Sequence, residues 1–108
     1  MAFYTFYQNN SGGFFTGPAQ YVIIEAPNPK VADAMAEING LYFDGVLDER
    51  DCDCCGDRWH RASDYDASAF PAIYDTAAAE YAAAHPHRSV LVVYANGVTA
   101  SYNGAAGE

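Results

Sequence analysis

Short runs of apolar residues, separated by turn-forming residues, divide the chain into its expected elements. Residues 2–8 and 20–26 are rich in aromatic and β-branched side chains, which predicts two β-strands. Residues 89–95 predict another strand. Asn96-Gly97 favours a tight turn, and the alternating residues 98–102 that follow predict the returning strand of a hairpin.

The stretch after the second strand has the pattern of an α-helix. Apolar residues recur there at helical spacing, which predicts a helix over 29–39. Asn28 is a preferred N-cap residue, Pro29 suits the first helical turn, and Gly40 is typical of a helix end. Residues 41–43 suggest one further short strand.

Alanine-rich residues 76–84 predict a second helix, with Asp75 as its expected cap. The order strand, strand, helix, polar loop, helix, hairpin predicts an α+β fold. We expect a small antiparallel β-sheet with both short helices packed on one face. A chain of 108 residues is the size of a single domain, 1–108.

The residues between the helices form a long polar segment, 44–66, which holds all three cysteines and the only tryptophan. A loop of this length inside a compact domain is usually functional, or is ordered by a metal or a partner. Candidate chemistry is therefore concentrated there.

Charge narrows the classes of partner. The formal net charge of −9 repels DNA, RNA and anionic membranes, so we expect no direct nucleic-acid binding and no membrane association. No apolar run approaches the length of a membrane span, and residues 1–15 lack the pattern of a signal peptide. Three closely spaced cysteines do not make a secreted disulfide framework, which favours a reducing cytoplasm.

One hypothesis for the loop is a metal site. Cys52, Cys55 and the following Gly56 have the spacing of half a zinc knuckle, and His60 is the expected third ligand. Cys54, His85 or His87 would have to complete the four ligands of zinc.

A second hypothesis uses the same Cys-x-x-Cys pair for redox or nucleophilic chemistry, although the neighbouring aspartates oppose a lowered thiol pKa.

The third hypothesis is recognition of a small nucleotide-like ligand by the only cationic patch of the chain. Arginine grips phosphate, and aromatic rings stack on bases. The expected ligand-binding residues are Arg58, Trp59, His60, Arg61, Asn9, Asn10, Tyr7 and Tyr42. The competing structural interpretation makes Trp59 a core residue and pairs Arg58 and Arg61 with nearby aspartates. No catalytic constellation is evident, so no catalytic residue is predicted.

Three segments together resemble a family of short tailed-phage proteins. They are Phe6-Tyr7-Gln8-Asn9-Asn10-Ser11-Gly12-Gly13, then Tyr42-Phe43-Asp44-Gly45-Val46, and then Asp51-Cys52-Asp53-Cys54-Cys55-Gly56-Asp57-Arg58-Trp59. The likeness covers most of residues 4–60. It implies a protein of the infected host's cytoplasm that acts as an accessory factor against host defences.

Within that context, the expected function is to bind and sequester a nucleotide-derived immune signal, such as a cyclic ADP-ribose isomer or a cyclic dinucleotide. One alternative is an acidic protein that binds and inhibits a host nucleic-acid-binding or defence enzyme. A second alternative is a small zinc-dependent hydrolase. Tyrosine-rich edge strands also suggest a homo-oligomer.

Overall fold

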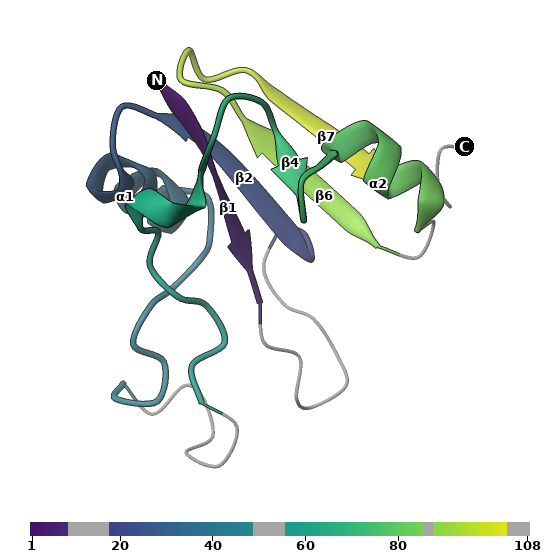
Figure 1. Cartoon of the computed structure of the whole chain (residues 1–108). Helices are drawn as coiled ribbons and strands as arrows, with labels where there is room; N and C mark the ends of the chain where they lie inside the picture. The colour runs from purple at the N-terminus through teal and green to yellow at the C-terminus, as the bar shows by residue number, and fades with distance from the viewer. Residues whose placement is uncertain (9–17, 49–55, 86–87, 104–108) are drawn as a thin grey trace.

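The computed structural model describes residues 1–8, 18–48, 56–85 and 88–103 (Figure 1). Its elements in chain order are β1 (Ala2–Tyr7), β2 (Tyr21–Ala26), α1 (Pro29–Ile38), the 3₁₀ helix η1 (Asp64–Asp66), β3 (Ala67–Ser68), β4 (Ala72–Ile73), β5 (Thr76–Ala77), α2 (Ala78–Ala84), β6 (Ser89–Val93) and β7 (Thr99–Asn103). The α+β class, the two α-helices and the C-terminal hairpin are confirmed.

The main sheet has five strands in the order β3-β1-β2-β6-β7, and β4 and β5 form a separate small hairpin. Strands β1 and β2 pair antiparallel, with Tyr4 opposite Ile24, and β6 pairs antiparallel with β7. Strands β2 and β6 are parallel, with Ile23 opposite Val92. The sheet is therefore mixed, whereas the sequence predicted an antiparallel one.

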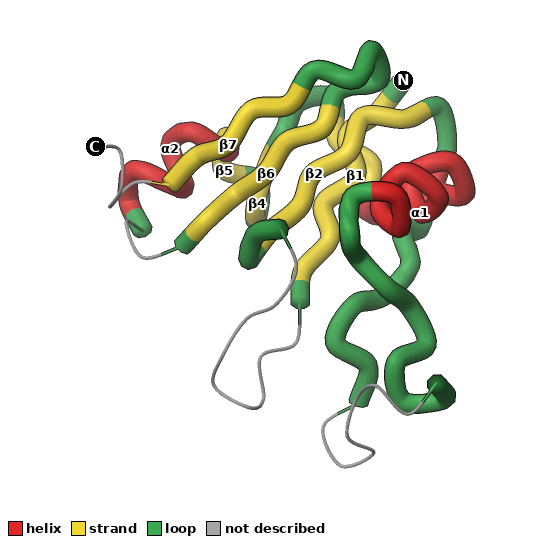
Figure 2. Tube along the Cα trace, turned by 180° about the vertical axis from the view of Figure 1, so that it is seen from behind, coloured by secondary structure: helices red, strands yellow, loops and turns green. Residues whose placement is uncertain are grey.

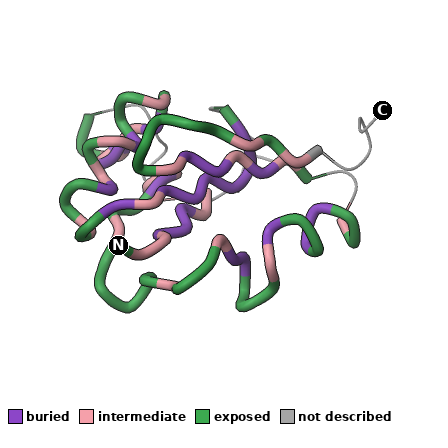
Figure 3. The backbone as a smooth tube through the Cα atoms, turned by 90° about the horizontal axis from the view of Figure 1, so that it is seen from above, coloured by how far each residue is buried: buried purple, intermediate pink, exposed green. Residues whose placement is uncertain are grey.

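The two helices lie on opposite faces of this sheet, which corrects the prediction of one shared face (Figure 2). On the α1 face, Ala32 and Ala36 pack with Val22 and Ile24. The α2 face buries a second set of side chains, among them Ile23 and others from β6, β4 and α2. From above, the buried strands form a layer with chain on both sides (Figure 3).

The physical reason lies in the central strands. Val22, Ile23 and Ile24 are all completely buried, so both faces of β2 are covered. An uninterrupted apolar run is typical of a strand that is covered on both sides, whereas alternation is typical of a half-exposed strand. A parallel neighbour also requires a crossover connection, and here the chain from β2 to β6 includes both helices.

The predicted start of α1 is confirmed, and the helix ends at Ile38, one residue before its predicted end. The Asn28 side chain accepts a hydrogen bond from the Val31 N–H at 2.9 Å, and Pro29 is the first helical residue. Gly40 follows the helix with φ +102°, a conformation in which a side chain would be strained.

Residues 41–43 are not a strand, because Leu41 and Phe43 pack into the α1-face core as irregular chain. The Leu41 N–H instead donates to the Ala36 carbonyl at 3.0 Å, which closes the end of the helix.

The second helix begins at Ala78, and Ala77 occupies the N-cap position without a side-chain hydrogen bond. Asp75 is therefore not the cap that the sequence suggested. It lies in the two-residue turn between β4 and β5, where Ile73 pairs with Thr76. The Asn96-Gly97 hairpin turn is confirmed, with Gly97 at φ +89°.

Candidate functional site

Trp59, at the centre of the predicted ligand patch, is a core residue. It is 1% exposed and packs in the α1-face cluster, and its backbone forms an isolated β-bridge with Gln8. Its indole Nε1–H is buried without a hydrogen-bond partner among the described residues. The ring therefore presents no face on which a base could stack.

Arg58 belongs to a small network that joins three distant parts of the chain. Its Nη1 donates to Gln8 Oε1 at 3.3 Å. The Gln8 Nε2 donates in turn to the carbonyls of Ala19 and Gln20, at 3.1 and 3.3 Å. Gln8 thus connects the end of β1 to the residues before β2 and to the loop, a role that its sequence position gave no reason to expect.

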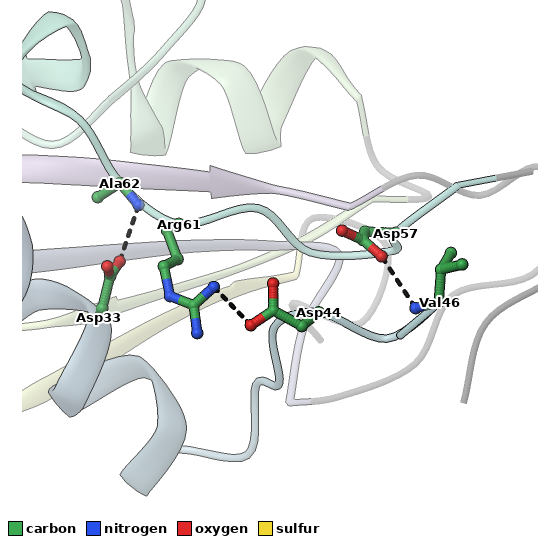
Figure 4. Close-up of polar contacts among 6 residues, drawn as sticks. All are labelled: Asp33, Asp44, Val46, Asp57, Arg61 and Ala62. Atoms are coloured by element: carbon green, nitrogen blue, oxygen red, sulfur yellow. Dashed lines mark hydrogen bonds and ion pairs between the residues drawn. The ribbon is translucent and has the colours of Figure 1, made fainter. Parts of the chain in front are cut away.

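Arg61 pairs with a carboxylate of the same loop. Its guanidinium lies 2.8 Å from the Asp44 carboxylate (Figure 4) and 5.2 Å from the ring centre of Phe43. The hydrogen bond to Asp44 is the main cause that raises the pKa of Arg61. The side chains are about half exposed, at 53% and 44%, so the pair is accessible to solvent.

Two further aspartates hold the same loop through the backbone (Figure 4). Asp57 Oδ1 accepts from the Val46 N–H at 2.9 Å, and Asp33 Oδ1 of α1 accepts from the Ala62 N–H at 2.8 Å. Carboxylates therefore already surround the cationic segment, which weakens its attraction for a phosphate.

Among the described residues, the predicted ligand residues do not all lie together. Tyr7 packs on the α2 face of the sheet, whereas the half-buried Tyr42 packs against the α1-face core. His60 is exposed. Asn9, Asn10, Cys52 and Cys55 lie outside the described residues, so the metal hypothesis stays a prediction. Within the described ranges, no three His, Cys, Asp or Glu side chains are grouped to hold a metal ion.

A pocket that the sequence did not predict opens on the α2 face, beside the edge of the sheet. It has a volume of about 180 Å³ and lies between β1, the η1–β3 segment and the β4–β5 hairpin. We call it the Tyr-Asp pocket, and its lining residues are Thr5, Tyr7, Tyr65, Asp66, Ala67, Ser68, Ala72, Tyr74 and Asp75. None of these residues is basic.

Long-range contacts assemble the pocket. The Thr5 hydroxyl donates to the Ala72 carbonyl at 2.6 Å and ties β4 to β1. The Tyr7 hydroxyl accepts from the Tyr74 N–H at 3.2 Å, and the two rings lie 5.0 Å apart at 31°. These residues are 67 positions apart in the chain, so no local pattern could have revealed the site.

The turn that supplies Tyr74 and Asp75 is conformationally costly. Both residues have left-handed backbone angles, φ +51° and +67°. A two-residue hairpin with two positive φ angles normally uses Asn-Gly, because larger side chains are strained there. This turn instead places an aromatic ring and a carboxylate at the pocket.

The pocket is electronegative. Burial raises the pKa of the Tyr7 hydroxyl, and the charges of Asp66 and Asp75 act in the same direction. Asp66 Oδ2 accepts hydrogen bonds from the N–H and the hydroxyl of Ser63, at 2.9 and 3.3 Å, which fixes its orientation. The Asp75 carboxylate makes no hydrogen bond or ion pair with the described residues, and it faces solvent.

A third polar cluster serves to hold α2 on the sheet. The hydroxyls of Tyr21 and Tyr81 lie 3.0 Å apart, and Arg88 donates to both. The His85 ring stacks on Tyr81 with 4.2 Å between ring centres. Burial, followed by the hydrogen bond to Tyr81, raises the pKa of Tyr21 to about 12.

Comparison with known proteins identifies a family. The model of the family described as Domain of unknown function (DUF7296) matches residues 1–108, so the chain belongs to this family. No curated protein and no solved structure matches the chain. Among the described residues, no helix has the length and apolar character needed to cross a membrane.

Proposed function

We propose that this member of the DUF7296 family works by binding a protein with a basic surface, and that the Tyr-Asp pocket lies at the centre of the interface. The observation that carries the proposal is the composition of the pocket: three tyrosines and two aspartates, with no basic residue. Aromatic residues are enriched at protein interfaces, and complementary charge directs the choice of partner.

The charge of the whole chain supports the same interpretation. A net charge of −9 attracts basic proteins over a distance and accelerates their association. Tyr65 is 99% exposed and Tyr74 is 67% exposed, so both rings offer area that a partner can cover.

The resemblance to tailed-phage proteins supplies a context for this proposal. An acidic protein in the host cytoplasm can occupy the basic nucleic-acid-binding surface of a host defence enzyme and so inhibit it. This function requires no catalytic residue on the acidic protein.

The test is affinity capture from host lysate with the tagged protein, washed at increasing salt. We expect a protein with a basic surface that the wild type retains at low salt and releases at high salt, because screening weakens exposed charge pairs. Asp75→Asn should reduce capture. Asp48→Asn is the matched control, since Asp48 is an exposed aspartate outside the pocket. Capture that is independent of salt, or equal for both variants, would contradict the proposal.

Sequestration of a nucleotide-like ligand is a second candidate, and one observation favours it. The contacts of Gln8 with Arg58 and Trp59 bring the residue before segment 9–17 next to the cationic loop. A guanidinium held in place by Gln8 suits a phosphorylated ligand, because arginine binds phosphate through parallel N–H donors. In this candidate Trp59 supports the site from the core and does not stack on the base.

Native mass spectrometry with cyclic dinucleotides and cyclic ADP-ribose isomers tests the second candidate. A ligand retained intact by the wild type and by Lys30→Ala, but lost by Arg58→Ala, would support it. Lys30 is an exposed basic residue of α1 and therefore controls for the lost charge. Equal retention by Arg58→Ala would exclude a role for this residue. The same spectra count subunits, and therefore test the proposed homo-oligomer.

A further inference from the structure

We infer that the Tyr-Asp pocket accepts the guanidinium group of an arginine side chain. This inference rests on the proposed function and names the group through which the partner would be recognised. The reasoning depends on which polar atoms of the pocket are already used and which remain.

Two hydroxyl groups of the pocket already have partners. The Thr5 hydroxyl donates to the Ala72 carbonyl, and the Ser68 hydroxyl accepts from the Phe70 N–H at 3.4 Å. The charged groups that remain are acceptors: the carboxylate of Asp75 and Oδ1 of Asp66, neither of which has a partner among the described residues. The tyrosine hydroxyls can donate as well as accept, so it is the negative charge of the pocket that favours a cation with N–H donors.

The aromatic residues determine the shape of the cation. The rings of Tyr7 and Tyr74 lie 5.0 Å apart at a tilt of 31°, and Tyr74 and Tyr65 are exposed at the pocket. A planar cation can lie against an exposed ring while its N–H groups donate to a carboxylate. Guanidinium is planar and weakly hydrated, it stacks on aromatic faces, and it donates in a fork that matches a carboxylate.

Lysine meets these conditions less well. Its ammonium is compact and strongly hydrated, and it cannot both lie flat on a ring and present two parallel donors. Stacking on a ring removes water from one face of the cation, so a group with a low cost of dehydration is favoured. The pocket should therefore prefer arginine to lysine.

The strained turn supports a binding role. Tyr74 and Asp75 both have positive φ, although neither is glycine or asparagine. Such conformations in folded proteins cluster at functional sites, where the cost is balanced by the placement of the side chains. Here the turn places a ring against Tyr7 and a carboxylate beside it.

The experiment is a titration of the ¹⁵N-labelled protein with Nα-acetyl-arginine N-methylamide, followed by amide chemical shifts. The citrulline analogue, which has nearly the same shape and no charge, is the matched control ligand. We expect arginine to shift amides of residues 65–68 and 72–75, lysine to bind more weakly, and citrulline to cause no saturable shift. Shifts of equal size with citrulline, or shifts confined to residues outside the pocket, would overturn the inference.

Variants then test the carboxylates. Asp75→Asn should weaken arginine binding by about two- to fivefold, the range of an exposed ion pair, whereas Asp48→Asn should leave it unchanged. Asparagine tolerates positive φ, so Asp75→Asn should keep its fold, which the thermal midpoint verifies. Equal affinities for the two variants would overturn the inference.

This experiment is independent of any partner protein. If the pocket binds arginine but Asp75→Asn captures partners as well as the wild type does, the proposed function fails and the pocket assignment remains. If partner capture depends on Asp75 but citrulline binds as well as arginine, the interface remains and the arginine assignment fails.

Discussion

Replacing Asp75 with glycine should stabilise the protein while it weakens binding at the Tyr-Asp pocket. Asp75 is exposed, has φ +67°, and makes no hydrogen bond or ion pair with the described residues. Its removal therefore relieves backbone strain without breaking a contact of the fold.

The size of the effect follows from two opposing terms. A left-handed conformation costs a residue with a side chain about 1–2 kcal/mol, and aspartate lies near the lower value because its short side chain is tolerated there. Glycine offsets about 0.5–1 kcal/mol of this gain, since it makes the unfolded chain more flexible. The net stabilisation should therefore be at most about 0.5 kcal/mol.

Urea denaturation and thermal unfolding can both detect this change. Unfolding entropy near 60 °C is about 2.1 cal/mol/K per residue, so a chain of 108 residues should gain up to about 2 °C in Tm. The matched control is Asp64→Gly, an exposed aspartate of η1 without a positive φ. We expect this control to lose about 0.5–1 kcal/mol.

If Asp75→Gly loses as much stability as Asp64→Gly, the reasoning about backbone strain is refuted. If Asp75→Gly is more stable but binds arginine as well as the wild type does, the link between the strain and binding is refuted. Higher stability together with weaker binding would show that the strained turn lowers stability but supports binding.

Three further predictions concern the core and the loop. Trp59→Ala should lower the free energy of unfolding in urea by about 3–5 kcal/mol, because it empties a buried site; a loss below about 1 kcal/mol would contradict the core assignment. Since the pKa of Tyr21 is raised from 10.0 to about 12, its contribution to stability is complete below pH 10 and is lost as the pH rises through 12. Tyr21→Phe should lessen this alkaline loss in unfolding curves, and an unchanged pH profile would contradict it. Arg61→Ala should leave the thermal midpoint unchanged within error, because its pair with Asp44 is exposed, and a clear drop would show that the pair holds the loop.

Elements that depend on neighbouring residues were predicted well from the sequence. The Asn28 cap, the first-turn Pro29 and the closing Gly40 determine α1 through contacts within a few positions. Asn96-Gly97 likewise determines the hairpin of β6 and β7. Each of these signals acts over fewer than about five residues, so the residues that interact are also neighbours in the sequence.

The candidate site was predicted less completely. The structural interpretation of Trp59 as a core residue agrees with its burial, and Arg61 does pair with an aspartate of the loop. Tyr7, proposed as a member of the ligand patch, lines a different pocket on the other face of the sheet. The sequence identified residue types suited to binding, but not their grouping.

The sequence by itself determined strands β1, β2, β6 and β7, the two α-helices, the hairpin and the acidic character, because these depend on local conformation and on composition. Only the tertiary structure decided that β2 and β6 run parallel, that the helices cover opposite faces, and that Tyr7, Asp66 and Tyr74 meet in one pocket. These features arise from burying β2 on both faces and from hydrogen bonds between residues 67 positions apart. Contacts between residues so far apart produce no local pattern in the sequence, so they can be identified only in the folded structure.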